Sequence, residues 1–391
     1  MNFYEFMKDE MEHTYQKSYH PIQEMLGDWW DSLLDQSKDL DIRDVVKIEV
    51  EKVIGCGSKE NGFAFYECDD CSNYMYVPFT CKSRFCPSCG FNATLNRSNI
   101  MPSRCLDVPH RHVTFTMPDI LWPLFRIDRS LLHELFLAAS STLLSWFLQQ
   151  SKFEKYTPGI IASLHTFGRD LKWNPHIHIL VTQGAMGRIT KWKPFDSIPY
   201  KMLRKRFMTK LLLNLSIHFE KDDKFKKLTN QLYKQYDKGF YVNAKKRKFP
   251  NTLLAVAYVT RYSNKPAIAE SRIIEYDGEY VSFWYKRHQD NNRVEEKVPV
   301  LDFIKRLIIH IPEKGFNTIR YYGIYAMRKS KTEHLKRIKE KPTKPLSWID
   351  KLILHFKCNP LKCSCGNTLK FQFIVERKSY KYFQLHYQHL L

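Results

Sequence analysis

The sequence lacks the features that would place the chain in or on a membrane. It has no run of about eighteen apolar residues, which is near the minimum length of a membrane-spanning helix. It shows no secretory signal after Met1 and no lone basic amphipathic segment that would act as an anchor. Internal repeats are also absent, so a repeat architecture is not expected. These absences predict a soluble cytoplasmic protein with no membrane partner.

Acidic residues are outnumbered by basic ones. The chain has 62 Lys and Arg against 41 Asp and Glu, and the net charge of +21 is spread along the sequence. Such an excess attracts polyanions, because the sequence-independent part of nucleic-acid affinity comes from neutralising phosphates. An anionic membrane surface would attract the same charge, but the absences above argue against it. The predicted partner is therefore a nucleic acid.

The length predicts two or three domains, because a domain holds roughly 100–200 residues and this chain has 391. The mixture of helix and strand patterns predicts an α+β protein. Hydrophobic residues make up 43%, more than a disordered chain carries, so most of the length should fold. The periodicity predicts, in chain order, helices in the first fifty residues, a strand in HRHVTFTMP from His110, a helix over 130–150, strands over 160–167 and 176–182, a basic helical insertion over 187–250, a helix from Thr252 to before Pro266, a hairpin turning at Asp277-Gly278, a helix over 301–309 and a strand over 319–325.

Ten cysteines in a chain without a secretory signal argue for reduced thiols, and their clustering argues for metal binding rather than disulfides. The segments ECDDC and FCPSC have the CxxC, fourteen residues, CxxC spacing of a four-thiolate zinc ribbon or knuckle. Closed four-cysteine sites are structural, so this zinc would shape a DNA-binding surface rather than perform chemistry. The predicted Zn²⁺ ligands are Cys68, Cys71, Cys86 and Cys89.

Several residues around this site leave alternatives open. Cys81 and Cys56 are extra thiols that could replace one of the four ligands or help to bind a second ion. Lys82 and Arg84 suit phosphate contact, although ordinary solvated charge is the other interpretation. At the other end of the chain, PLKCSCG has a CxC spacing, and whether Cys358, Cys363 and Cys365 bind zinc, with His355 as a fourth partner, is left open.

A histidine pair marks the candidate reaction site. His176 and His178 lie in a strand-like run, where side chains alternate, so both imidazoles point to one face. Alone, an HxH triplet is more often incidental than metal-binding. His165 lies in the preceding predicted strand, and the turn GRDLKWNP would fold that strand back beside His176. Three such ligands would leave open positions on a metal for water and a phosphate oxygen.

Two tyrosines follow downstream. Tyr258 and Tyr262, in AYVTRY, are four residues apart on a predicted helix and therefore lie on one face. A tyrosine hydroxyl has a pKa of about 10, so it needs a metal or a base to act as a nucleophile. Taken alone, the pair is more simply explained by helix packing. Its combination with the histidine pair favours the catalytic interpretation.

A His-hydrophobic-His strand followed by a helix with Tyr-x₃-Tyr resembles the HUH single-strand endonucleases, where U is a hydrophobic residue. More narrowly, the ordered segments TCKSRFCPSC, HRHVTFTMP, LHTFGRDLKWNPHIHILVT, YVTRYSNKPAIAESRI and IRYYGIYA resemble the two-tyrosine transposases of bacterial rolling-circle insertion sequences. The resemblance covers about residues 55–370, and the joint order is more specific than any single motif.

The resemblance implies a ferredoxin-like antiparallel sheet whose central strand presents His176 and His178 to Mg²⁺ or Mn²⁺, with His165 as a third ligand. It implies that Tyr258 and Tyr262 are nucleophiles that form a 5′-phosphotyrosine and release a 3′-hydroxyl on single-stranded DNA at element ends. The expected domains are a helical region over 1–53, a zinc-binding domain over 54–105, a nuclease domain over 106–335 and a basic, cysteine-bearing tail over 336–391. A transposase of this kind would work at the nucleoid.

Further basic residues are candidates for DNA contact, with aromatic neighbours that could stack bases. A solvated basic surface is the comparable alternative. The candidates beyond the zinc region are Lys205, Arg206, Lys245, Lys246, Arg247 and Arg261, the aromatics are Phe207, Phe240 and Tyr241, and Asn174 flanks the histidine pair.

Two other functions fit part of the pattern. A rolling-circle replication initiator or a relaxase would share the histidines and a tyrosine. A non-enzymatic, zinc-dependent DNA-binding regulator would carry the same motifs as structural elements only.

Overall fold

The computed structural model describes residues 20–36, 42–71, 73–90, 93–94, 101, 105–244, 267–287, 289–327, 335, 347, 349–350, 353, 359 and 361–377. The chain divides into two compact units. One comprises Met1–Ala93, Pro266–Ile311 and Leu346–Leu391, and the other comprises Thr94–Lys265 and Pro312–Pro345. The segment 266–311, expected within the nuclease domain, therefore belongs with the amino-terminal region, and so does the carboxy-terminal tail.

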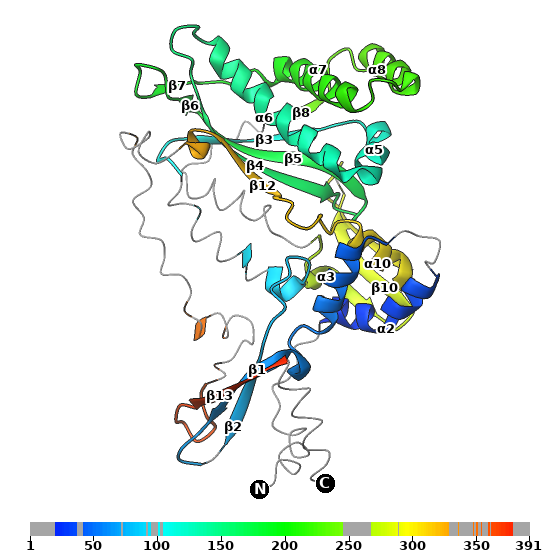
Figure 1. The fold of residues 1–391 in the computed structure, drawn as a ribbon, viewed down its shortest axis with the longest axis vertical. Coiled ribbons are helices and arrows are strands. Elements are labelled where there is room, and N and C mark those ends of the chain that lie inside the picture. Colours follow the sequence, from blue (N-terminus) through cyan, green and yellow to red (C-terminus); the bar gives the residue numbers. More distant parts are fainter. Residues whose placement is uncertain are drawn as a thin grey trace. The chain divides into compact units, whose positions relative to one another are not determined.

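The second unit is built on a five-stranded antiparallel sheet in the order β12-β4-β5-β3-β8 (Figure 1). Its strands are β3 (His110–Thr116), β4 (Gly159–Phe167), β5 (Trp173–Thr182), β8 (Tyr241–Ala244) and β12 (Ile319–Gly323). A small two-stranded ribbon, β6 (Gly184–Ala185) with β7 (Lys193–Pro194), follows β5. The predicted strands over 160–167, 176–182 and 319–325 and the strand from His110 are confirmed, although β12 ends in a short 3₁₀ turn, Ile324–Ala326.

One face of this sheet is apolar and lies beneath helices. Val113 and Phe115 on β3 pair with Ile179 and Ile177 on β5, and directly paired residues point to the same side of a sheet. All four side chains are fully buried. Phe115 packs edge-on against Phe207 of α7, with ring centroids 5.0 Å apart. Helices therefore cover this face of the sheet (Figure 1). On the opposite face Ile161 and Leu180 are buried in a cluster with Met101 and Cys105.

The covering helices are α5 (Trp122–Ile127), α6 (Leu132–Gln149) and α7 (Tyr200–His218), with 3₁₀ turns at Asp119–Leu121 and Arg129–Leu131. A further helix, α8 (Asp223–Gln235), packs against α7. These confirm the helix predicted over 130–150 and the helical character of the insertion. The stretch Arg129–Gln149 is long and apolar enough to cross a membrane by composition alone. Most of it is buried within the protein, which is the position of a core helix.

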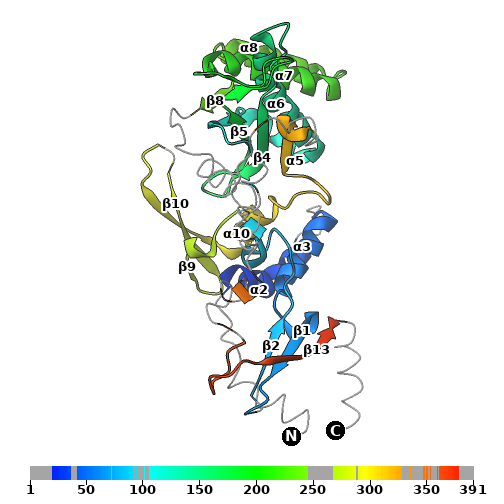
Figure 2. The ribbon, with the colours of Figure 1, turned by 90° about the vertical axis from the view of Figure 1, so that its left-hand side faces the viewer.

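The first unit packs amino-terminal helices α2 (Pro21–Gln36) and α3 (Asp44–Ile54) with α10 (Val300–Ile308) and the sheet β9 (Ile273–Tyr276), β10 (Tyr280–Lys286) and β11 (Arg293–Pro299), as Figure 2 shows. The hairpin turn at Asp277-Gly278 and the helix over 301–309 are confirmed. Trp29 Nε1 donates to the Gly278 carbonyl at 2.7 Å and Arg43 Nη2 to the Ile311 carbonyl at 2.8 Å. These long-range bonds explain why the 266–311 segment belongs to this unit.

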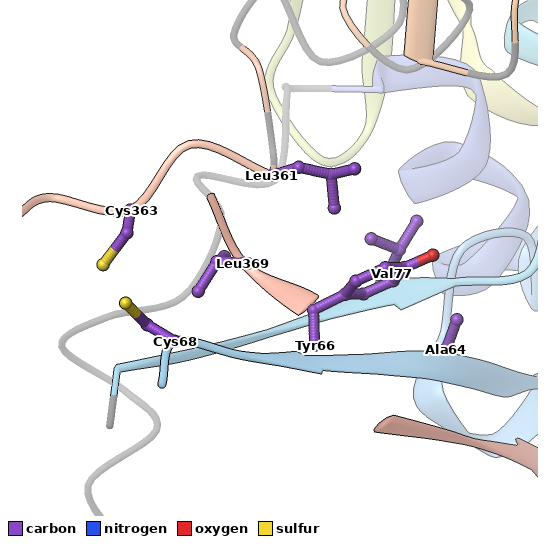
Figure 3. Packing of buried hydrophobic residues seen from close by; sticks show 7 residues of the cluster. All are labelled: Ala64, Tyr66, Cys68, Val77, Leu361, Cys363 and Leu369. Atoms are coloured by element: carbon purple, nitrogen blue, oxygen red, sulfur yellow. The ribbon is translucent and has the colours of Figure 1, made fainter. Parts of the chain in front are cut away.

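A second small sheet in this unit joins the two ends of the chain. Its order is β13-β1-β2, from β1 (Gly62–Glu67), β2 (Tyr74–Pro78) and β13 (Lys370–Glu376), with both pairings antiparallel. A 3₁₀ turn, Lys59–Asn61, leads into β1, and another, Glu270–Arg272, leads into β9. Buried side chains from β1, from β2 and from the segment that precedes β13 form one cluster, shown in Figure 3.

Candidate functional site

Three imidazoles converge on the face of the five-stranded sheet that lies opposite Phe115 and Ile177. His165 on β4 pairs directly with His176 on β5, and Ser163 pairs with His178, so all four side chains share one face. The ring nitrogens of the three histidines lie within 4.8 Å of one another. His176 Nε2 and His178 Nε2 are 3.1 Å apart. The structure therefore brings the three predicted metal ligands together.

Hydrogen bonds at the Nδ1 atoms orient the rings of His176 and His178. His176 Nδ1 lies 2.6 Å from the carbonyl oxygen of Asn174. A carbonyl can only accept, so Nδ1 carries the proton and Nε2 presents its lone pair. His178 Nδ1 lies 2.8 Å from His112 Nε2 and 3.3 Å from Thr114 Oγ1, which turns its Nε2 toward the other two rings. Such second contacts are what a metal-ligating histidine requires.

The cluster lies at the boundary of the interior. His165 is 6% exposed, whereas His176 and His178 are half-buried. Two buried polar atoms on the same face, Ser163 Oγ and Asn174 Oδ1, have no hydrogen-bond partner among the residues that the structure describes. Buried polar groups are nearly always paired, with protein, water or an ion. The donor set, the orientation of the rings and these orphan oxygens together fit a bound divalent ion with water.

The two predicted nucleophiles, Tyr258 and Tyr262, lie outside the described residues. So do the DNA-contact candidate Arg261 and the helix that was predicted to begin at Thr252. Lys245, Lys246 and Arg247 lie outside them too.

A neighbouring histidine has a structural environment. His110 is 1% exposed; its Nδ1 donates to the Val108 carbonyl at 2.7 Å and its Nε2 lies 2.5 Å from the Tyr325 hydroxyl. Burial lowers the pKa of His110 to about 4, and the hydrogen bond to Val108 opposes this shift without cancelling it. Its imidazole is therefore neutral at pH 7. The ring fixes the start of β3 to the 3₁₀ turn that follows β12.

The cysteines form two groups that differ from the predicted set. The sulfurs within each group lie within 4.8 Å of one another, and both groups are in the first unit. The prediction of one site from the two CxxC pairs is therefore wrong in its pairing, because the two pairs belong to different groups. The first group is Cys56, Cys81, Cys86 and Cys89, and the second is Cys68, Cys71, Cys363 and Cys365.

The first group has the dimensions of a zinc site. Its sulfurs are 3.6 to 3.7 Å apart where they touch: Cys56 to Cys89, Cys81 to Cys89 and Cys86 to Cys56. Four thiolates at about 2.3 Å from Zn²⁺ in a tetrahedron are about 3.8 Å apart. Hydrogen bonds from Cys56 and the other two thiols lower the pKa of Cys89, whereas its bond to Cys56 raises the pKa of Cys86. The extra thiols Cys56 and Cys81 are thus full members of this group.

The predicted DNA-binding residues have varied positions. Lys82, Arg84 and Lys205 lie in the described part and are all exposed there. Arg206 donates to Gln149 Oε1 across two helices. Phe207 and Phe240 are 0% and 1% exposed, so the expectation that they stack bases is wrong: they fill the space between α7 and the sheet. Tyr241 is 53% exposed and carries Arg204 against its ring.

Sequence reasoning missed His112 and the carboxy-terminal cysteines. His112 had a signal: in His110-Arg111-His112 the alternation of β3 repeats the pattern of β5, so a histidine of this strand faces the same side as His178. Cys363 and Cys365 had no such local signal, since their partners lie 292 and 297 residues away.

Comparisons with known proteins agree on one family. The family model described as "Transposase zinc-binding domain" matches residues 25–117, and the model described as "Putative transposase" matches residues 159–333, which include all three histidines. The chain is 32% identical over 360 residues to the "Transposase for insertion sequence element IS801" of Pseudomonas savastanoi pv. phaseolicola, covering 86% of this chain and 85% of that protein. It is 27% identical over 277 residues to "Putative transposase y4qJ" of Sinorhizobium fredii (strain NBRC 101917 / NGR234), covering 67% and 69%. No solved structure matches the chain.

Proposed function

The chain belongs to the IS91-type transposases with an amino-terminal zinc-binding domain, and on that basis we propose that it cleaves and rejoins single-stranded DNA at element ends through a 5′-phosphotyrosine intermediate, as a rolling-circle transposase. The observation that carries this proposal is the convergence of His165, His176 and His178 on one face of the sheet. The antiparallel sheet with helices over its other face supports assignment to the ferredoxin-like HUH fold.

The histidine cluster would hold the catalytic ion. One ring nitrogen of each histidine lies within 4.8 Å of the other two, and three protein ligands leave further positions on an ion open. Of the two ions considered, Mn²⁺ fits three nitrogen donors better than Mg²⁺, which prefers oxygen. When bound, the ion neutralises negative charge that develops on the phosphate.

The tyrosines would perform the group transfer. The phenolic oxygen of Tyr258 or Tyr262 attacks the phosphorus and loses its proton to solvent, and the bond from phosphorus to the 3′ oxygen breaks. That oxygen takes up a proton and leaves as a 3′-hydroxyl, while the 5′-phosphate stays on the tyrosine. Because the phosphodiester energy is retained in the new ester, a second 3′-hydroxyl reverses the step without ATP. Two tyrosines would allow two strands to be held at once.

The rest of the surface would guide the strand. The residues proposed to contact phosphates are the exposed Lys82, Arg84 and Lys205, together with Lys245, Lys246, Arg247 and Arg261. Tyr241 is exposed and is proposed to stack a base. With this substrate, the protein would work in the cytoplasm, at the nucleoid.

The test is cleavage of a labelled single-stranded oligonucleotide carrying an element end, with Mn²⁺ and then Mg²⁺. Wild type should leave a covalent protein–DNA adduct that survives denaturation. The double variant Tyr258→Phe/Tyr262→Phe should form none, and Tyr233→Phe, an exposed tyrosine of α8, should behave as wild type. His176→Ala/His178→Ala should lose metal-dependent cleavage by about 100-fold or more, whereas His218→Ala on α7 should not.

The outcomes separate the alternatives. Adduct formation by the double tyrosine variant would remove the nucleophile assignment. Tight DNA binding without any cleavage in either metal would favour a zinc-dependent regulator. Cleavage with rejoining only on the same strand, and no excision of a marked element in cells, would favour a replication initiator or a relaxase.

A further inference from the structure

A second four-thiol group lies at the junction of the two chain ends. Cys68 directly follows β1 and Cys71 lies in the turn after it, while Cys363 and Cys365 lie in the turn that leads to β13. Cys68 Sγ is 3.6 Å from Cys365 Sγ, and Cys71 Sγ is 3.4 Å from Cys363 Sγ. A disulfide would hold two sulfurs at about 2.0 Å. The four thiols are therefore free and unbridged.

The dimensions match a tetrahedral metal site. Contacts of 3.4 and 3.6 Å, with all four sulfurs within 4.8 Å, lie close to the edge of about 3.8 Å that four Zn–S bonds of about 2.3 Å produce. The first cysteine group has contacts of 3.6 to 3.7 Å. The two groups are therefore alike in size and in donor type.

The two halves of the group are built as matching turns. Cys68 N–H donates to the Asn73 carbonyl at 2.7 Å, and Cys363 N–H donates to the Asn367 carbonyl at 2.8 Å. Gly366 takes a φ of 94°, which a residue with a Cβ rarely adopts, so the CxC turn can close within four residues. This tighter turn replaces the CxxC turn and still presents both sulfurs.

Packing holds the turns against each other. Cys68 and Cys363 are 1% and 5% exposed and share a cluster with Leu369. Figure 3 shows their sulfurs turned toward each other at the end of that cluster. Two hydrogen bonds between the turns flank them: Asn73 Nδ2 donates to Ser364 Oγ at 2.8 Å, and Asn367 Nδ2 donates to Asp70 Oδ2 at 2.7 Å. Strand pairing from Gly62 with Glu376 to Glu67 with Lys370 continues the junction.

We propose that Cys68, Cys71, Cys363 and Cys365 bind a second structural zinc ion, which fastens the carboxy-terminal strand β13 to the amino-terminal sheet. The ligand pairs are separated by 292 to 297 residues, and closing so long a loop costs entropy that a metal bond offsets. The zinc-binding family model covers residues 25–117 and so contains only half of these ligands. The zinc-binding domain of this chain is thus completed from the opposite end of the sequence.

Zinc stoichiometry of the full-length protein tests this. By elemental analysis, Cys363→Ser/Cys365→Ser should bind one zinc ion fewer per chain than wild type, and Cys105→Ser, a buried cysteine outside both groups, should bind the same number. Cys365→His should keep the wild-type count, because Cys₃His is a common structural zinc set. Hydrogen exchange of the β13 amides should accelerate by about tenfold or more in the double variant, with β4 and β5 unchanged. A double variant with an undiminished zinc count would overturn the proposal.

A measurement on the unmodified protein covers the case in which that variant fails to fold. Cys71 and Cys365 are exposed, so as free thiols both would react quickly with iodoacetamide. As zinc ligands they should stay unmodified, in peptide mass spectra, until a chelator is added. Rapid alkylation of both cysteines in untreated, folded protein contradicts the second site.

Discussion

His112 offers a direct test of how the histidine cluster is oriented. It is 6% exposed, its Nε2 lies 2.8 Å from His178 Nδ1, and the two rings stack with centroids 5.0 Å apart and planes 17° from parallel. If His178 binds the ion through Nε2, its Nδ1 carries a proton that His112 accepts. His112→Phe keeps a flat ring of similar size in the stack and removes the acceptor.

The magnitude follows from the contacts that remain. Thr114 Oγ1, at 3.3 Å, is the more distant of the two Nδ1 partners described above, so it replaces His112 only in part. Loss of such a second contact typically lowers metal affinity by about 10- to 100-fold, or ~1.4 to 2.7 kcal/mol. Folding without metal should change by less than about 1.5 kcal/mol, since one buried hydrogen bond is exchanged for an apolar ring contact.

Titration of Mn²⁺ into the full-length protein, followed by calorimetry or electron paramagnetic resonance, measures the effect, and urea unfolding measures stability. Thr114→Val, which alters the more distant partner of the same nitrogen, should weaken Mn²⁺ binding by well under tenfold. The reasoning is refuted if His112→Phe binds Mn²⁺ as tightly as wild type, or if Thr114→Val has the larger effect. Equal losses of folding stability and affinity would also refute it, because the effect would then be structural.

Three further predictions concern the scaffold. Burial holds the pKa of His110 at about 4, whereas the unfolded value is about 6.5, so the unfolded chain binds more protons between these pH values. The free energy of unfolding, measured with urea, should therefore fall by ~2 kcal/mol as the pH is lowered from 6.5 to 5. In His110→Gln this pH dependence should be much smaller. Gly323→Ala should destabilise the second unit by more than ~2 kcal/mol in thermal unfolding, because Gly323 has a φ of 59° and a Cβ there would lie 1.9 Å from the Pro158 carbonyl oxygen. Asp222→Ala should cost ~1 kcal/mol, since Asp222 caps α8 by accepting from two backbone N–H groups, whereas Asp223→Ala should cost less; equal losses would remove the capping explanation.

The histidine cluster was predictable because its information is local. β4 and β5 form a hairpin, so the strand period of two and one short turn suffice to place His165 beside His176. The turn is specified by its own residues: Gly168 N–H bonds the Lys172 carbonyl at 2.9 Å, and Lys172 N–H bonds Asp170 Oδ1 at 3.3 Å. The irregular pairing between His165 and Phe167 could not be predicted, since a β-bulge follows from cross-strand packing rather than from the strand's own sequence.

The domain division was less predictable for the same physical reason. The hairpin β9–β10 and helix α10 were visible as local patterns, but their partners were not. Trp29 reaches Gly278 across 249 residues and Arg43 reaches Ile311 across 268, so the assignment of this segment depends on contacts that no window of sequence contains. The aromatic residues Phe207 and Phe240 were misassigned similarly, since a basic helix with aromatics has the same composition whether its aromatics face DNA or a sheet.

The cysteines show how a correct chemical inference can carry a wrong geometry. CxxC spacing fixes that two thiols share a turn, and it predicts zinc correctly at the level of the domain. It says nothing of which two turns meet, because that depends on strand pairing. Here β1 pairs with β2 on one side and with β13 on the other, so the turn after β1 meets the CxC turn before β13. Cys86 and Cys89 instead group with Cys56 and Cys81, and the backbone nitrogen of Cys81 lies 3.3 Å from Cys56 Sγ. A sheet that takes one edge strand from each end of the chain thus requires two four-thiol groups where the sequence suggests one.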